Sequence, residues 1–232
     1  MCDWIRKLLK RFNKEKEVDT VDEVMSEKEI AFTVQEGCCN QIKILALADL
    51  HFWEKEELQK IRDYEFDVCV LLGDIPQVAI TEIVAIVKEK PILAVPGNHD
   101  TWEMFEGFSV VDLHRKTTEV CGVSFAGFGG SVRYKKGPYA MHTEEECREL
   151  IEGLPKADIL ISHDCMHGLF GKEGSHAGLK GISEYILKNK VRLNICGHHH
   201  QMCVKTEKGS TTVCVYRCAL ITYPEVRVEE IF

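Results

Sequence analysis

Apolar runs alternate with amphipathic segments along most of the chain. The runs IKILALAD (42–49), DVCVLLGD (67–74) and PILAVPGNHD (91–100) are typical of buried strands, and the stretches between them repeat apolar residues at helical spacing. Strands that alternate with helices at intervals of about 25 residues predict a mostly parallel sheet built from right-handed crossovers. The chain is therefore expected to adopt an α/β fold.

A more antiparallel pattern follows in the middle and at the end of the chain. The segment 117–130 predicts a hairpin that turns at Cys121-Gly122, and the last segment, 201–232, predicts hairpins with a turn at Lys208-Gly209. Between them, ADILISHD (157–164) and VRLNICGHHH (191–200) predict two further buried strands, separated by a helix.

The first 27 residues differ from the rest. Apolar and basic residues alternate at helical spacing in MCDWIRKLLKRFNKEK, which predicts a basic amphipathic helix, and an acidic linker follows it. The helix is too short and too charged for a signal peptide. Peripheral contact of residues 2–14 with an anionic membrane surface, docking on the protein's own domain or a partner, and a frayed leader all remain open. Residues 28–232 are expected to form the folded domain, with EIAFTV (29–34) as its first strand.

Composition narrows the function classes. The 232 residues with 45% hydrophobic content suffice for one sizeable core, and a formal net charge of -8 argues against broad attraction to nucleic acid without excluding it. The eleven cysteines are odd in number, include no CxxC pair and lie mostly inside apolar runs, so they are interpreted as reduced thiols in a cytoplasmic protein. No apolar run approaches the roughly 20 residues of a membrane span.

Polar residues follow five of the predicted strands at the end where each strand stops. In open α/β sheets these carboxyl ends converge on the ligand site, so residues distant in sequence are expected to meet there. Any one of these residues would more often be a turn or a helix cap, but their joint occurrence predicts a metal site. The candidates are Asp49, His51, Asp74, Asn98, His99, His163, His198 and His200.

The ligand types indicate which ions would bind. Carboxylate, amide oxygen and imidazole without thiolate suit manganese, iron or zinc, and manganese is the first expectation. There are too many ligands for one ion, which suggests two divalent ions. Asp49 and Asp74 would offset two of their four positive charges, and the remainder would attract a hydroxide and a phosphate oxygen.

The ordered series DLH, GD, GNHD, SHD and GHHH resembles the five-block signature of the calcineurin-like metallophosphoesterase superfamily, here closest to its small bacterial and phage-type members. The resemblance covers residues 42 to about 203. It implies a four-layer αββα sandwich of two mixed β-sheets flanked by helices, with a dinuclear metal site at the carboxyl ends of the strands. Carried over by position, one ion would take Asp49, His51, Asp74 and His200, and the other Asp74, Asn98, His163 and His198.

The same resemblance implies roles for the remaining histidines. His99 would not ligate but would protonate the leaving alkoxide or stabilise the transferring phosphoryl group. On an extended strand His198 and His200 would share one face and reach the two ions, whereas His199 would face away and is given a role toward the substrate or behind the ligands.

The chain also departs from one branch of the superfamily. Phosphoprotein phosphatases carry an acidic partner for the catalytic histidine three residues after the GD aspartate, where GDIPQ has Gln77, and their arginine block is missing. This argues against a serine/threonine protein phosphatase. Asp100 is left with two interpretations, one in which it orients a neighbouring histidine and one in which it is a turn residue that caps the next helix.

Two loops suggest how substrate binds. The first loop, residues 127–146 (GFGGSVRYKKGPYAMHTEEE), resembles a loop of small family members. Its Arg133 and the neighbouring lysines and tyrosines could hold a second phosphate or a base. The alternative is a charged loop that only faces solvent. In the second loop, 163–181, His176 matches a family histidine, but Cys165 and Met166 replace the prolines of relatives. Arg133, His176 and His199 are the predicted substrate-binding residues.

The leading hypothesis is a phosphoesterase that hydrolyses a small phosphomonoester or phosphodiester by attack of a metal-bound hydroxide. One alternative is a metal-dependent nuclease, which the acidic charge disfavours. The other is a non-catalytic scaffold of the same fold, which the complete ligand set disfavours.

Overall fold

The computed structural model describes residues 30–31, 41–171 and 173–232. The predicted amphipathic helix and acidic linker therefore lie outside the described residues. Of the predicted first strand, Ile30–Ala31 form β1, which pairs in parallel with β6.

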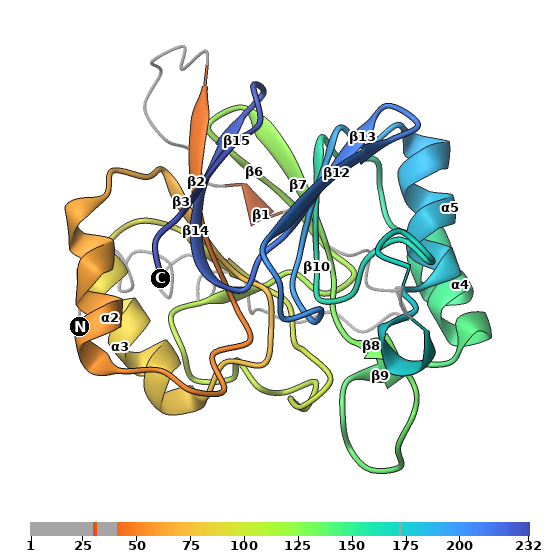
Figure 1. Ribbon diagram of the computed structural model, residues 1–232, viewed down its shortest axis with the longest axis horizontal. Helices are drawn as coiled ribbons and strands as arrows, with labels where there is room; N and C mark the ends of the chain where they lie inside the picture. Colours follow the sequence, from red (N-terminus) through yellow and green to blue (C-terminus); the bar gives the residue numbers. More distant parts are fainter. Residues whose placement is uncertain (1–29, 32–40, 172) are drawn as a thin grey trace, which may run out of the picture.

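Two mixed β-sheets lie face to face at the centre of the described part of the chain (Figure 1). One has the strand order β15 (Arg227–Glu230), β14 (Arg217–Tyr223), β2 (Ile42–Ala48), β3 (Val68–Leu71), β4 (Ile92–Ala94) and β5 (Val111–Asp112). The other has the order β1, β6 (Thr117–Val120), β7 (Val123–Phe128), β10 (Ile159–Ser162), β11 (Leu193–Cys196), β13 (Ser210–Cys214) and β12 (Cys203–Glu207). A small separate ladder pairs β8 (Ser131–Val132) with β9 (Met141–His142).

Helices cover the outer face of each sheet (Figure 1). On one side lie α2 (Lys55–Gln59), the 3-10 helix η1 (Lys60–Asp63) and α3 (Gln77–Val87), and on the other lie α4 (Glu144–Glu152) and α5 (Lys180–Asn189), with the 3-10 helix η2 (Gly174–His176) in a loop. The predicted four-layer αββα sandwich is confirmed. None of the described helices is long and apolar enough to cross a membrane.

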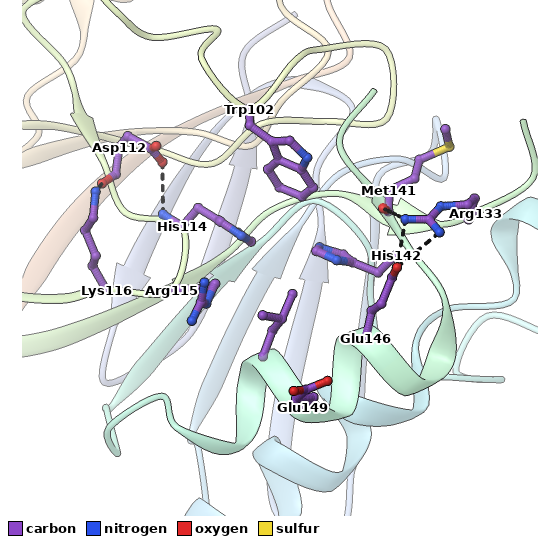
Figure 2. Close-up of a pocket in the computed structure, with 11 residues that line it drawn as sticks. Trp102, Asp112, His114, Arg115, Lys116, Arg133, Met141, His142, Glu146 and Glu149 are labelled. Carbon is purple, nitrogen blue, oxygen red and sulfur yellow. Dashed lines mark hydrogen bonds and ion pairs between the residues drawn. The ribbon is translucent and has the colours of Figure 1, made fainter. Parts of the chain in front are cut away.

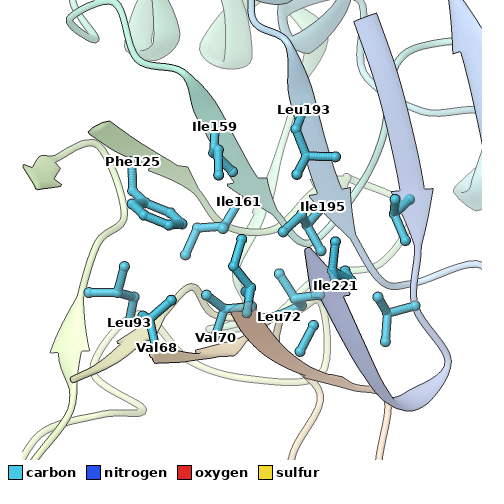
Figure 3. Close-up of a cluster of buried hydrophobic side chains, with 14 of the residues drawn as sticks. Val68, Val70, Leu72, Leu93, Phe125, Ile159, Ile161, Leu193, Ile195 and Ile221 are labelled. Atoms are coloured by element: carbon cyan, nitrogen blue, oxygen red, sulfur yellow. The ribbon is translucent and has the colours of Figure 1, made fainter. Parts of the chain in front are cut away.

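The main core lies between the two sheets. Figure 3 shows Val68 and Val70 of β3 facing Ile159 and Ile161 of β10 across this layer, and all four side chains are fully buried. The alternate residues of the same strands face outward and pack under the helices: Cys69 and Leu71 under α3, Leu160 under α4 and α5. Both faces of these strands are therefore buried, which explains why their sequences are continuous apolar runs rather than alternating ones.

Local signals fix the element ends. Helix α4 begins at a capping box in which Thr143 Oγ1 accepts from the Glu146 amide at 3.2 Å and the Glu146 carboxylate accepts from the Thr143 amide at 2.8 Å. The predicted hairpin turns are confirmed, since Cys121 and Gly122, like Lys208 and Gly209, have positive φ angles and join antiparallel strands.

The parallel strands set the position of the polar loops. β2, β3 and β4 run parallel in one sheet, and β7, β10 and β11 run parallel in the other. The carboxyl ends of each set therefore lie along one edge of its sheet, and contacts between side chains that follow β3 and β10 show that the two edges meet.

Candidate metal centre

The ligand loops leave their strands through unusual backbone conformations. Asp49 directly follows β2 and has φ 55°, Asp74 follows β3 and has φ 54°, and His198 and His200 have φ 67° and 49°. Residues other than glycine rarely adopt positive φ, and such strain is concentrated at functional sites. The extended conformation assumed for residues 198–200 is wrong, because β11 ends at Cys196 and the chain turns sharply after it.

Asp74 lies at the centre of the group. Its Oδ2 is 4.0 Å from His51 Nε2 and 3.6 Å from His163 Nε2, and its Oδ1 accepts a hydrogen bond from the His99 amide at 2.8 Å. The side chain is almost entirely buried. One carboxylate oxygen thus faces two imidazoles from different sheets, which is the arrangement that a bridging ligand requires.

Asp49 provides the second carboxylate. Its Oδ2 accepts from the His198 amide at 2.7 Å, and its Oδ1 lies 3.6 Å from His200 Nε2. This Oδ1 is buried and has no hydrogen-bond partner among the described residues. A buried carboxylate oxygen without a partner is costly, so this position suits a bound cation.

His163 and Asn98 show the same need for a cation. His163 Nδ1 donates to the Leu72 carbonyl at 2.6 Å, so Nε2 of the neutral ring carries a lone pair. That nitrogen faces Asn98 Oδ1 at 2.8 Å as well as Asp74 Oδ2. Asn98 keeps this orientation because its Nδ2 donates to the Tyr134 hydroxyl at 2.9 Å. Three electron-rich atoms that face each other require a proton or a metal ion between them.

The pKa shifts agree with this geometry. Burial opposes protonation of His163, but the charges of Asp74 and Asp49 outweigh it and raise its pKa. The pKa of His200 is raised chiefly by its interaction with Asp49. Both imidazoles are therefore drawn toward a positively charged state by the two carboxylates.

His198 and His51 complete the group. His198 Nε2 donates to the Ser175 carbonyl at 2.6 Å, and its ring lies 4.9 Å from that of His163. The predicted substrate residue His176 stacks on His198 with 4.5 Å between ring centroids. The ring of His51 is exposed, as are those of His99 and His200, so the group opens to solvent on this side.

Two overlapping sets of three residues have ligand atoms that all lie within 4.8 Å of one another: Asp49 with His51 and His200, and Asp49 with Asp74 and His163. The first set contains three of the four residues expected for one ion. Of the second expected set, Asp74 and Asn98 both contact His163, and His198 lies beside His163. The structure thus brings together all the strand-end residues that the sequence singled out.

Asp100 has a role that neither interpretation gave it. Its Oδ2 accepts from the amides of Gly97 and Asp74, both at 2.8 Å, so it ties the GNHD loop to the GD loop. Burial, together with the charge of Asp74, raises its pKa to about 6.

His99 contacts a lysine from a distant loop. Lys135 Nζ lies 3.4 Å from His99 Nδ1, and the same ammonium lies 3.9 Å from the ring centroid of Tyr139. An ammonium group can only donate, so His99 Nδ1 accepts and the neutral ring carries its proton on Nε2. Burial lowers the pKa of His99, and the Lys135 charge acts in the same direction.

Two pockets adjoin this loop. One, of about 410 Å³, is lined by Lys135, Lys136 and Tyr139 together with Trp102 and Arg133. Figure 2 shows the other, of about 630 Å³, which shares Trp102, Arg133 and Met141 with the first. The guanidinium of Arg133, a predicted substrate residue, forms an ion pair with Glu146 at 2.7 Å and donates to the Met141 carbonyl at 3.1 Å.

His199 lies behind the cleft rather than in it. It is 2% exposed and contacts Asp164 and Cys165. Its binding of substrate stays a prediction.

The groups that hold the ligands in place could not be predicted from the sequence. The carbonyls of Leu72 and Ser175 orient His163 and His198, and backbone carbonyls leave no signal in a sequence. Tyr134 was noticed as a potential substrate contact, but its bond to Asn98 depends on a loop that approaches from another sheet.

A family model described as the calcineurin-like phosphoesterase superfamily domain matches residues 42–216. The uncharacterized protein MJ1162 of Methanocaldococcus jannaschii is 28% identical over 189 residues, which are 74% of this chain and 86% of that protein.

Solved structures agree in fold. TT1561 of Thermus thermophilus has a TM-score of 0.60 at 16% identity and covers 82% of this chain and 99% of its own. Phosphopantetheinyl hydrolase (PptH) of Mycobacterium tuberculosis has a TM-score of 0.50 at 11% identity and covers 75% of this chain and 89% of its own. The family match extends over most of the chain and includes every one of the ligand loops, so the chain belongs to the calcineurin-like phosphoesterase superfamily.

Proposed function

We propose that this protein hydrolyses a small phosphomonoester or phosphodiester with the help of two divalent metal ions, manganese being the first candidate. The superfamily consists of metal-dependent phosphoesterases. The observation that carries the proposal is the position of the Asp74 carboxylate between His51 and His163, next to a buried oxygen of Asp49 that has no hydrogen bond among the described residues.

The donor set fits such ions. Asp49, His51, Asp74 and His200 would hold one ion, and Asp74, Asn98, His163 and His198 the other. When bound, the pair supplies an activated water and polarises the phosphoryl group. The donors are carboxylates, an amide oxygen and imidazoles, which suit manganese, iron and zinc.

Hydrogen bonds within the chain orient several of these donors. Hydrogen bonds to the Leu72 and Ser175 carbonyls set the ring orientations of His163 and His198, and Asp100 locks the loops that carry Asp74 and Asn98. Such outer contacts hold ligands in the geometry that binding needs and make them better donors.

His99 acts on the leaving oxygen or on the transferring phosphoryl group. Because Lys135 donates to Nδ1, the Nε2–H of His99 is available to donate a hydrogen bond toward the exposed side of the cleft. The hydrogen bond stabilises negative charge that develops there in the transition state. Lys135 itself adds a positive charge beside the reacting group.

The adjoining pocket of about 410 Å³ suits the remainder of a small ester. Lys135 and Lys136 supply charge, and Tyr139 and Trp102 supply aromatic faces. A small organic phosphate fits these dimensions better than a polymer would.

The test uses the full-length protein with added Mn²⁺ and two reporters, nitrophenyl phosphate and its bis-ester. We expect metal-dependent release of nitrophenol from at least one of them, abolished in Asp74→Asn. Asp63→Asn, which removes the same charge from an exposed position in η1, serves as the matched control and should keep full activity. A metal-loaded protein inert toward both esters, or an Asp74→Asn variant as active as the wild type, would contradict the proposal.

A further inference from the structure

Three potential metal ligands lie together outside the cleft. Asp164 and Cys165 follow His163 at the end of β10, and His199 lies between the cleft histidines after β11. These three side chains are 0%, 1% and 2% exposed. None of them belongs to the ligand sets assigned to the dinuclear centre.

Their contacts converge on a single atom. His199 Nε2 lies 3.1 Å from Cys165 Sγ and 3.4 Å from Asp164 Oδ1, and the three ligand atoms all lie within 4.8 Å of one another. In a proton relay the thiol and the carboxylate would bind different nitrogens of the imidazole. Here both face Nε2, which has one proton or one lone pair to offer. Convergence of this kind is typical of ligands around a metal ion.

The spacing suits zinc. Zinc bonds of about 2.3 Å to sulfur and 2.0 to 2.1 Å to nitrogen and oxygen, in a tetrahedron, place ligand atoms roughly 3.3 to 3.6 Å apart. The measured distances of 3.1 and 3.4 Å from His199 Nε2 are close to these values. Little movement would be needed to bind an ion.

The Asp164 carboxylate provides an independent indication. Its Oδ1 accepts from the Cys165 amide at 2.8 Å, whereas its Oδ2 is buried and has no hydrogen-bond partner among the described residues. A fully buried carboxylate is costly without a counter-charge. Among the described residues, the His199 imidazole is the ion-pair partner of this carboxylate at 3.4 Å, and a divalent ion bound between the two groups would supply the positive charge in its place.

Cys196 is the candidate for a fourth ligand, and its thiol would have to move toward the three atoms that lie within 4.8 Å of one another. The thiol of Cys196, the last residue of β11, interacts with that of Cys165 and is fully buried. The ring of Phe170 lies 5.0 Å from that of His199. The cluster is therefore closed to solvent, as structural zinc sites are, whereas the cleft opens to it.

We propose that Asp164, Cys165, His199 and Cys196 bind a zinc ion that is separate from the dinuclear centre. The ion would join the loop after β10 to the loop after β11. His163 precedes this cluster in the first loop, and His198 and His200 flank His199 in the second. The zinc ion would thus hold three ligands of the cleft in position from behind.

Cobalt distinguishes the two sites, because the cleft has no thiolate ligand. The full-length protein is loaded with Co²⁺ and its ultraviolet absorption is recorded. We expect a thiolate-to-cobalt charge-transfer band in the wild type that is lost in Cys165→Ser. The band should persist in two control variants. One is Cys121→Ser, which removes a partly buried thiol at the β6–β7 turn, and the other is Asp74→Asn, which changes the cleft. Metal analysis after zinc loading should give one zinc per chain fewer in Cys165→Ser than in the wild type.

Several outcomes would overturn the proposal. These are a wild-type protein that binds cobalt without a thiolate band, a band unchanged in Cys165→Ser, and equal zinc content in both proteins. A band that also disappears in Asp74→Asn would place the thiolate in the cleft instead. The wild-type spectrum decides even if Cys165→Ser fails to fold. Since the readout is spectral, it is independent of whether the protein hydrolyses phosphoesters.

Discussion

Histidines gather in two places in this protein, and the two groups differ in what they face. In the cleft, His163 and His200 each lie 3.6 Å from an aspartate oxygen. Beside the larger pocket, His114 and His142 stack on each other and on Trp102, with ring centroids 4.6 to 5.8 Å apart (Figure 2). The first group meets carboxylates, the second mostly aromatic rings.

The pKa values of His163 and His200 follow their carboxylate partners rather than burial, whereas burial lowers the pKa of His99 and lowers that of His198 to about 4. Burial lowers the pKa of His114 to about 3 and that of His142 to about 4. His163 is more deeply buried, yet its pKa is raised because two aspartates outweigh the burial. His163 therefore lies beside carboxylates that favour a proton or a metal ion, whereas His114 and His142 stay neutral.

Neutral imidazoles serve a structural purpose beside the pocket. Both bind the backbone of Gly129: His114 Nδ1 accepts from its amide at 3.0 Å, and His142 Nε2 donates to its carbonyl at 3.0 Å. These bonds need a neutral His114, because a protonated ring has no acceptor. The contrast between the residues of the cleft and the histidines beside the larger pocket, His114 and His142, leads to four predictions.

The largest effect is expected in a comparison of two single variants, one with a histidine of the cleft replaced and one with a histidine beside the larger pocket replaced. His163→Asn should lower kcat/KM by about 10³-fold or more, since loss of metal-assisted stabilisation is worth several kcal/mol. His114→Asn, which retains an acceptor near the position of Nδ1, should stay within about threefold of the wild type. Steady-state kinetics at saturating Mn²⁺ measures both. Equal losses would mean that the two groups do not differ in function.

The next effect concerns His99. His99→Ala should lower kcat by about 10²-fold to 10⁴-fold, as expected for loss of a general acid or donor. His99→Gln places an amide N–H near the position of Nε2 and should recover part of this loss. The ratio of the two kcat values is the measurement. A Gln variant as inactive as the Ala variant would argue for full proton transfer rather than hydrogen bonding.

Lys135 should have a smaller effect. Lys135→Ala removes a charge-assisted contact worth about 1.5 kcal/mol, so kcat/KM should fall roughly tenfold. Lys135→Arg keeps the charge and should retain most of the activity, and Lys116→Ala, a lysine of the larger pocket, should change little. If Lys135→Ala is indistinguishable from the wild type, the proposed role of the lysine fails.

The last prediction concerns stability rather than activity. His114 and His142 have folded-state pKa values of about 3 and about 4, below the unfolded value of 6.5, so protons bind preferentially to the unfolded chain between these limits. Their contribution is present above pH 6.5 and is lost as the pH falls toward 4, by up to about 1.4 kcal/mol per pH unit for each. The free energy of unfolding, measured with urea at several pH values, should depend less steeply on pH in His142→Gln, which keeps the N–H donor, than in the wild type. An unchanged slope would contradict this assignment.

The hydrophobic pattern was sufficient for an α/β fold with buried strands and for the gathering of the strand-end residues, whereas the four layers followed from the family resemblance. Runs such as DVCVLLGD are apolar on both faces of a strand, and this pattern fits only a sheet covered on both sides. The strand pattern predicted a single, mostly parallel sheet whose strand ends bring Asp74 and His163 together although 89 residues separate them. The two side chains do lie 3.6 Å apart, but their strands belong to two different mixed sheets, so the contact depends on how the sheets pack.

Other features were decided only by the folded chain. The positive φ angles of His198 and His200, the bond from Asn98 to Tyr134 and the convergence of Asp164, Cys165 and His199 depend on contacts between loops from different strands. Periodicity reports which face of an element is buried, but not which backbone carbonyl or neighbouring loop a side chain will meet. The sequence therefore determined which residues gather at the sheet edges, and tertiary contacts determined their orientation, their charge state and the second cluster behind them.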